Sequence, residues 1–273
     1  MTLTGVAPTL TPLKQIDQAL RDDGFAVVSA ETVAEFSNVD LSKLQDLTKY
    51  WENLPRDPYL KDGGRYRFRR HASYEIKGDE LTLVPHRAHW QSLDYNALHG
   101  GIERWFEPIQ GELLSNTAWQ SVLLGLAHIL NSLKPVNTWF VEAHQFRIDT
   151  TDGIGRPTPE GAHRDGVDFV AVFLLGREGI KGGETRIFDT SGSAGLRFTL
   201  TQPWSLLLMN DQRMIHESTP IQPLAKYGYR DTLVLTYRSN GFQDSPNQVS
   251  NKPAHLLWLH ASFFNRFGPL SSF

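Results

Sequence analysis

Beyond Pro135, this 273-residue chain carries a succession of short runs of β-branched, aromatic and other apolar residues, and no other feature limits its fold as strongly. Glycine, proline, asparagine and aspartate separate the runs, which is the pattern of β-strands joined by turns. Four glycines in the segment 176–183 predict a hairpin loop, so we expect a mostly antiparallel sheet. The predicted strands are Thr138–Ile148, Asp168–Leu175, Thr185–Phe188, Trp204–Met209 and Thr232–Tyr237.

The first half of the chain instead favours helices. The spacing of apolar residues predicts helices over Leu13–Arg21, over Leu41–Leu54 and from Asn116 to Pro135, where the proline ends the last one. The apolar run Phe25–Val28 predicts a single strand among them. Helices in the first half and strands in the second predict an α+β fold, in which a helical layer covers one face of a β-sandwich or barrel.

The chain shows no internal repeat, low-complexity tract or linker, so we predict one domain over residues 1–273. Within it we distinguish a helix-rich half (1–135), a strand-rich core (about 136–240) and a C-terminal segment (241–273). In that segment Ala254–Phe264 is amphipathic, and we expect it to pack on the barrel or on a second subunit. A monomer and a homodimer both remain open.

The composition excludes several classes of protein. A net charge of −3 argues against binding to the phosphate backbone of nucleic acids. The chain contains no cysteine, which excludes disulfides, zinc fingers, iron–sulfur clusters and thiolate nucleophiles, so any metal must be bound by nitrogen and oxygen. Nucleophile-elbow, Walker A and dinucleotide-binding motifs are also missing. Without a membrane-length apolar run or a signal peptide, we expect a cytoplasmic protein with a small-molecule partner.

One histidine and one aspartate stand two residues apart in His163-Arg164-Asp165. In an extended segment such residues point to the same side, so both side chains can bind one metal ion. His216 follows a predicted strand and is the candidate third ligand. Two histidines and one carboxylate on one face of an ion leave positions open, as in non-haem Fe(II) oxygenases. The alternative is a chance pattern with hydrogen-bonded surface histidines.

A candidate anion site begins the last predicted strand. Arg230 and Thr232 project to the same face, where a guanidinium and a hydroxyl can bind a carboxylate. The alternative is a surface arginine paired with Asp231.

Two further segments carry candidates for substrate binding. The alternation in Arg65–Arg70 fits a half-buried strand, in which Arg67, with Tyr66 beside it, is a candidate partner for a substrate carboxylate. Gln145 and Arg147 share one face of a later strand, and we expect that face to line the pocket.

The remaining histidines near these segments are expected to serve other roles. For His144, on the opposite face of the strand from Arg147, we expect a buried, hydrogen-bonded core position rather than metal binding. We expect neither His86 nor His89 to be a metal ligand, because no third partner is evident in the sequence.

Taken together, several segments resemble the bacterial 2-oxoglutarate/Fe(II)-dependent dioxygenases of the L-isoleucine hydroxylase type. The resemblance covers most of residues 23–237. The matching stretches are 64–69, 100–106, 142–147, 160–170, 182–185, His216 with 219–221, and 229–236.

The resemblance implies a fold, a site and a reaction. The implied fold is a double-stranded β-helix, a jelly roll with helices packed outside the larger sheet. The implied iron ligands are His163, Asp165 and His216, while Arg230, helped by Thr232, would hold the distal carboxylate of 2-oxoglutarate. Asp168, in one of the matching stretches, is an additional candidate for substrate binding.

The implied activity is oxidation of an aliphatic C–H bond of a free L-amino acid or close derivative, most simply its hydroxylation. 2-Oxoglutarate and O₂ would be converted to succinate and CO₂. Desaturation, cyclisation including cyclopropanation, and sulfoxidation are alternative outcomes of the same chemistry. A jelly-roll binding protein that has lost its metal is the alternative from another class.

Overall fold

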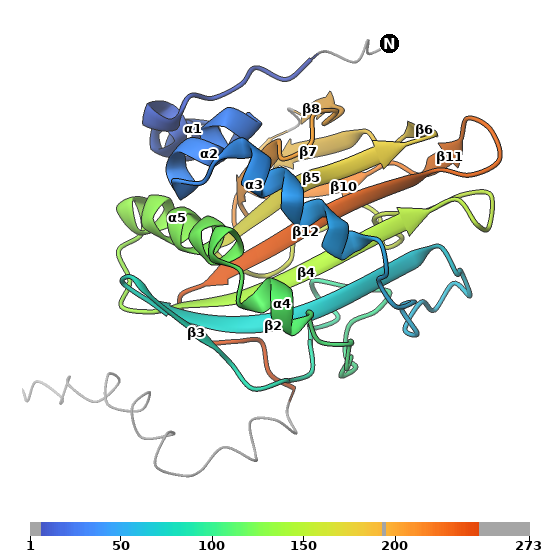
Figure 1. Ribbon diagram of the computed structural model, residues 1–273, viewed down its shortest axis with the longest axis horizontal. Coiled ribbons are helices and arrows are strands. Elements are labelled where there is room, and N and C mark those ends of the chain that lie inside the picture. The colour runs from blue at the N-terminus through green and yellow to red at the C-terminus, as the bar shows by residue number, and fades with distance from the viewer. Residues whose placement is uncertain (1–6, 193–194, 246–273) are drawn as a thin grey trace, which may run out of the picture.

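Three antiparallel sheets dominate the computed structural model, which describes residues 7–192 and 195–245. The largest has seven strands in the order β1-β9-β5-β12-β4-β2-β3, beside a three-stranded sheet β10-β7-β8 and a two-stranded sheet β11-β6 (Figure 1). The strands are β1 (Phe25–Val28), β2 (Arg67–Lys77), β3 (Glu80–Leu83), β4 (Trp139–Asp149), β5 (Phe169–Glu178), β6 (Ile180–Gly182), β7 (Thr185–Asp189), β8 (Gly195–Phe198), β9 (Leu206–Asn210), β10 (Met214–Ser218), β11 (Ile221–Pro223) and β12 (Tyr229–Arg238).

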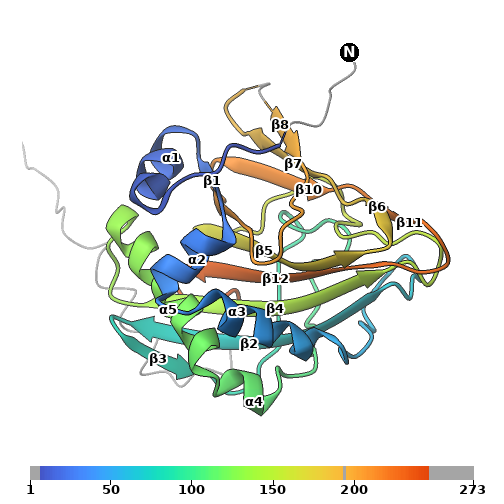
Figure 2. The same cartoon turned by 45° about the horizontal axis from the view of Figure 1, so that its top comes forward.

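The helices gather on one side of the large sheet (Figures 1 and 2). The longest, α5, begins where the side chain of Asn116 accepts hydrogen bonds from the backbone N–H groups of Ala118 and Trp119, and it ends before Pro135. No helix in the described ranges is long and apolar enough to cross a membrane. The helices are α1 (Ile16–Asp22), α2 (Ala30–Ser37), α3 (Leu41–Asp46), α4 (Gly111–Leu114) and α5 (Thr117–Leu133), with 3₁₀ turns at Leu13–Gln15 and Leu47–Trp51.

The main hydrophobic core fills the space between these helices and the large sheet. Trp119 and Leu126 of α5 pack there against alternate residues of the central strands, such as Val141 of β4. Trp119 also donates a hydrogen bond from its ring N–H to the hydroxyl of Tyr74 in β2. Because side chains alternate along a strand, the residues between these core positions face the other side of the sheet.

On that other side, the smaller sheets face the large one. A second apolar cluster joins Val170 of β5 and Met209 of β9 to Ile187 of β7 and Met214 of β10. The polar residues of β2, β4 and β12 line a cavity on the same side of the large sheet. The fold therefore separates an apolar, helix-covered face from a face that carries the polar cavity.

All five strands predicted beyond Pro135 are present, as are the strand Phe25–Val28 and the helices that begin near Leu13, at Leu41 and after Asn116. The predicted hairpin loop over 176–183 is wrong. β5 continues to Glu178, Gly179 turns the chain at a φ of 63°, and β6 then pairs with β11 in a different sheet. The segment Ala254–Phe264 lies outside the described residues.

Candidate active site

His163, Asp165 and His216 come together as the His-x-Asp pattern predicts, and we call them the triad. His163 and His216 form an antiparallel bridge in which each backbone N–H donates to the carbonyl of the other, at 3.0 and 2.9 Å. The Nε2 atoms of His163 and His216 lie 3.9 and 3.7 Å from the two carboxylate oxygens of Asp165. One potential ligand atom from each residue lies within 4.8 Å of the other two, so one ion can reach all three.

Hydrogen bonds from outside the triad fix its geometry. The Nδ1–H of His163 donates to the carbonyl of Gly161 at 2.9 Å, so Nε2 is the ring nitrogen left for a metal ion. Burial, together with His163, lowers the pKa of His216 to about 3, so its imidazole is neutral at pH 7. Asp165 accepts a hydrogen bond from the amide of Gln91 at 3.2 Å. The residue types and their arrangement fit a divalent iron ion.

Arg230 and Thr232 of β12 line the same cavity as the triad and are both buried. No carboxylate in the described part of the chain forms an ion pair with Arg230. Asp231 points to the opposite face and binds Arg147 instead, so the predicted alternative of an Arg230–Asp231 pair is wrong. Burial and the nearby Arg177 lower the pKa of Arg230 to about 10, which leaves it protonated at neutral pH. A buried, unpaired guanidinium is suited to binding a carboxylate.

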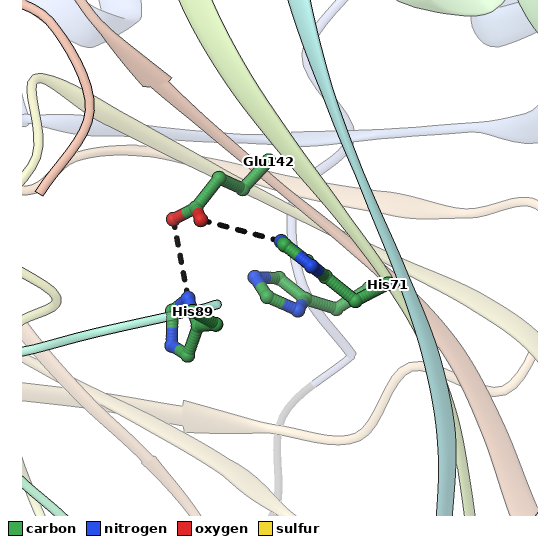
Figure 3. A group of neighbouring side chains, drawn as sticks. His71, His89 and Glu142 are labelled. Carbon is green, nitrogen blue, oxygen red and sulfur yellow. Dashed lines mark hydrogen bonds and ion pairs between the residues drawn. The ribbon is translucent and has the colours of Figure 1, made fainter. Parts of the chain in front are cut away.

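A second group, fully buried, has residue types consistent with an iron site and consists of His71, His89, Glu142 and His144. One oxygen of Glu142 accepts from His71 Nε2 and the other from His89 Nδ1, each at 3.2 Å (Figure 3). Arg87 also contacts this carboxylate, at 3.4 Å. A guanidinium N–H of Arg69 donates to Nδ1 of His144 at 2.7 Å.

Some of the predicted substrate-binding residues line the cavity and others do not. Arg67 lines the cavity. Tyr66 is buried outside it and donates its hydroxyl hydrogen to Asp62. Asp168 also lies outside the cavity lining, where it pairs with Lys134 and accepts from the backbone and hydroxyl of Ser239.

Gln145 and Arg147 lie on the face of β4 that is turned away from the cavity, contrary to our expectation. The amide of Gln145 donates to the carbonyl of Tyr50, and Arg147 forms its two hydrogen bonds with Asp231. The cavity is lined instead by the alternate residues of β4, among them His144, which is buried and hydrogen-bonded as predicted.

A loop between β3 and α4 supplies cavity residues that the sequence reasoning missed. They are His89, Gln91, Asn96 and Arg104. Backbone hydrogen bonds between His89 and Arg104 hold the two sides of this loop together. The loop has neither helical nor strand periodicity. Its sequence signals were His89, which was considered only as a metal ligand, and the matching stretch 100–106, which contains Arg104.

A family model described as 2OG-Fe dioxygenase matches residues 48–236, which include the triad, Arg230 and the second histidine group. The chain belongs to this family. The dioxygenase accordingly uses Fe(II) and 2-oxoglutarate, and the predicted enzyme class and cofactors are confirmed.

Three known proteins are similar to the dioxygenase. A crystal structure of a bsmA homologue from Methylobium petroleophilum PM1 is 48% identical, with a TM-score of 0.84, over 89% of the dioxygenase and 100% of that chain. The 3(1)-hydroxy-L-isoleucine 4-dioxygenase of Pantoea ananatis is 28% identical over 215 residues, which are 76% of the dioxygenase and 86% of the relative. IDO from Bacillus thuringiensis, 19% identical, shares the fold with a TM-score of 0.68 over 88% of this chain and 99% of that one.

Proposed function

We propose that the dioxygenase hydroxylates an aliphatic C–H bond of a free L-amino acid or a close derivative, and converts 2-oxoglutarate and O₂ to succinate and CO₂. The observation that carries the proposal is the cavity itself, which combines the triad with a buried guanidinium that has no carboxylate partner. The name of the Pantoea relative, which acts on a hydroxylated isoleucine, supports the amino-acid class. The other side chains that line the cavity leave space for a small molecule. We therefore propose a small molecule rather than a polymer as the substrate.

The triad is the better iron site of the two histidine groups. Among the described residues, the amide of Gln91 is the one donor that a metal ion would have to displace from the triad's three ligand atoms. In the second group, both oxygens of Glu142 and Nδ1 of His144 already accept hydrogen bonds. Metal binding there would break these bonds and place the ion next to Arg69 and Arg87, whose positive charges oppose it.

Arg230 and Thr232 would hold the distal carboxylate of 2-oxoglutarate, and their common face of β12 directs both side chains into the cavity. Bound iron would supply the reactivity toward O₂. The residues of the chain would position the two organic molecules, since orientation of the target carbon decides which C–H bond reacts.

We further propose that the facing sheets form a double-stranded β-helix within a single domain. The antiparallel pairing of every named strand and the second apolar cluster between the large and small sheets support this.

The test is succinate release by purified protein loaded anaerobically with Fe(II), then given 2-oxoglutarate and O₂ with a panel of free L-amino acids. Succinate that depends on an amino acid, with a product heavier by one oxygen atom, supports the proposal. A product lighter by two hydrogens would replace hydroxylation by desaturation or cyclisation. A protein that binds no iron and releases no succinate would instead be a binding protein.

A matched pair of variants tests where the iron binds. We expect His163→Ala to lose iron, measured as bound metal after gel filtration, and His71→Ala to retain it. The reverse result would move the iron to the second histidine group.

A further inference from the structure

Three arginines that the iron and 2-oxoglutarate do not need line one part of the cavity. Arg67 and Arg69 come from β2 and Arg104 from the loop before α4, and each is at most 4% exposed. Burying a guanidinium is costly unless an anion or hydrogen-bond acceptors satisfy it. Three such groups beside one another therefore need an explanation.

Among the described residues, only one carboxylate forms an ion pair with any of these three arginines. Asp57 lies 2.7 Å from Nε of Arg67 and 3.9 Å from Nη1 of Arg69, so one carboxylate serves two arginines. Arg104 has no ion pair in the described ranges, and its Nη2 donates only to the neutral amide of Gln91 at 2.9 Å. Burial and Arg67 lower the pKa of Arg104 to about 10, which leaves it charged at pH 7. Glu142 and Glu160 also line the cavity, but neither forms an ion pair with any of these three arginines in the described part of the chain.

His144 adds a donor of fixed direction. Because Arg69 donates to its Nδ1, that nitrogen must carry the lone pair, and the ring hydrogen is on Nε2. Nε2 of His144 has no partner among the described residues, and it is not one of the atoms that protein fully encloses. Its N–H is therefore available to a molecule in the cavity.

His89 adds an acceptor in the same way. Its Nδ1 faces the carboxylate of Glu142, which can only accept, so Nδ1 carries the hydrogen. Burial lowers the pKa of His89 to about 3, so the ring is neutral at pH 7. Nε2 of His89 is left with a lone pair and no described partner. The ring centres of His89 and His144 are 4.7 Å apart, and both residues line the cavity.

We propose that these five residues form the subsite that binds the polar end of the substrate. Arg67, Arg69, Arg104 and the Nε2–H of His144 bind a free carboxylate, and Nε2 of His89 accepts a hydrogen bond from an adjacent N–H or O–H group. A carboxylate beside such a donor defines an α-amino or α-hydroxy acid. The inference rests on the proposed function and assigns the recognition of the substrate to residues separate from Arg230.

The first test needs no variant. The probes are the free L-amino acids of the panel and the α-amide of each, and the readouts are stimulated succinate release and binding measured by calorimetry under anaerobic conditions. We expect an amino acid that stimulates turnover to lose at least tenfold in affinity as its amide, since one charge-assisted contact of this kind is worth about 1.4 kcal/mol or more. Equal action of acid and amide would overturn the subsite assignment.

The second test compares Arg104→Met with Arg65→Met, a control in which the arginine is exposed and bound to Asp152. We expect Arg104→Met to raise KM for the amino acid at least tenfold, with Arg104→Lys between it and the wild type, while the control is unchanged. Succinate release without any amino acid should be the same in Arg65→Met and the wild type, whereas in the Arg104 variants it is measured separately, because Gln91 connects Arg104 to Asp165. An unchanged KM in Arg104→Met would contradict the subsite.

The two proposals fail in different ways. A wild-type protein that binds no iron and releases no succinate with any amino acid would contradict the proposed function itself. Basal release that no free amino acid stimulates, and no binding of any, would reject the amino-acid class together with this subsite. Stimulation by amides as well as acids would reject only the subsite.

Discussion

Asp211 is a carboxylate that supports the triad without belonging to it. It is buried, and its two oxygens accept from the backbone N–H groups of Asp165, Gly166 and Val167 at 2.8–3.0 Å. These bonds hold the turn that carries Asp165 against the end of β9. The position of the metal-binding carboxylate therefore depends on a residue 46 positions later in the chain.

We predict that Asp211→Asn weakens Fe(II) binding by roughly 10- to 100-fold, the usual effect of removing a group that orients a ligand. An amide has one acceptor oxygen, so it cannot satisfy all three N–H groups. Titration with Fe(II) under anaerobic conditions measures the change. Asp189→Asn, an aspartate that accepts from the backbone of Ser191 away from the cavity, is the control. Equal iron affinity of the two variants would contradict the prediction.

Asp57 combines a structural role with a pH dependence. Burial raises the pKa of this carboxyl, but Arg67 and Arg69 outweigh burial and hold the pKa below its ordinary value of 3.8. Because the pKa of Asp57 is lower in the folded state than in the unfolded one, its ion pairs with Arg67 and Arg69 stabilise the fold above pH 4. That contribution is lost as the pH falls through the lowered pKa.

We predict that Asp57→Asn lowers the free energy of unfolding at pH 7 by about 3 kcal/mol, because it leaves buried guanidinium groups without an anion. Urea unfolding measures the loss, and the difference from the wild type should shrink below pH 4. Asp152→Asn, which breaks an exposed pair with Arg65, should leave stability unchanged. A constant difference across this pH range would show that the charge of Asp57 is not responsible.

At the scale of elements, Gly125 sets how closely two helices approach. A Cβ atom at this position of α5 would lie 2.7 Å from the backbone oxygen of Phe36 in α2. Alanine normally stabilises a helix interior relative to glycine by up to about 1 kcal/mol. Here the contact with α2 opposes that gain.

We predict that Gly125→Ala lowers the free energy of unfolding by about 1–3 kcal/mol, the usual range for forcing extra atoms into a packed core. Gly111→Ala at the start of α4 is the matched control, since an added Cβ there meets nothing within 4 Å. Chemical denaturation measures the free energy of unfolding of both variants. A Gly125→Ala variant that is more stable than the wild type would contradict the prediction, because α2 would then move away without cost.

The sequence was informative about elements whose patterns are regular. Apolar runs predicted β5, β9 and β12 because their buried residues are nearly continuous, and the periodicity of α5 is that of a helix with one buried stripe. The turn at Gly179 was misjudged, because a glycine with positive φ ends a strand in the same way whether the chain returns in a hairpin or crosses to another sheet.

The site was only partly predictable for a related reason. The short spacing between His163 and Asp165 brings them together in any extended segment. For β4 alternation defines two faces but does not say which faces the cavity, because Glu142 and His144 on one face are as polar as Gln145 and Arg147 on the other. Only the partners, Asp231 on one side and Arg69 on the other, distinguish them.

The cavity is lined by strands of the large sheet and by β10 of the smaller sheet that faces it. A ligand bound there should therefore stabilise the entire fold. A ligand at about 100 times its dissociation constant adds about 2.7 kcal/mol to the free energy of unfolding. For a chain of this size that corresponds to a rise in Tm of about 5–10 °C.

We predict a rise of this size when Fe(II) and 2-oxoglutarate are added under anaerobic conditions, measured by differential scanning fluorimetry. His163→Ala should show little of the rise in Tm that depends on Fe(II). If it shows the same shift as the wild type, the ion that stabilises the fold is bound elsewhere.

The residues that line the cavity come from two kinds of segment, the strands with their adjoining segments and the loop between β3 and α4. The triad and Arg230 come from the β-strands and the segments joined to them, whereas His89, Gln91, Asn96 and Arg104 come from a loop whose sides are tied by the His89–Arg104 backbone bonds. In the proposed role of this loop, His89 and Arg104 bind the substrate, whereas Gln91 donates to Asp165 and accepts from Asn96 and Arg104. The same loop would therefore couple the choice of substrate to the position of a metal ligand, so a change of substrate preference has to keep Gln91 in place.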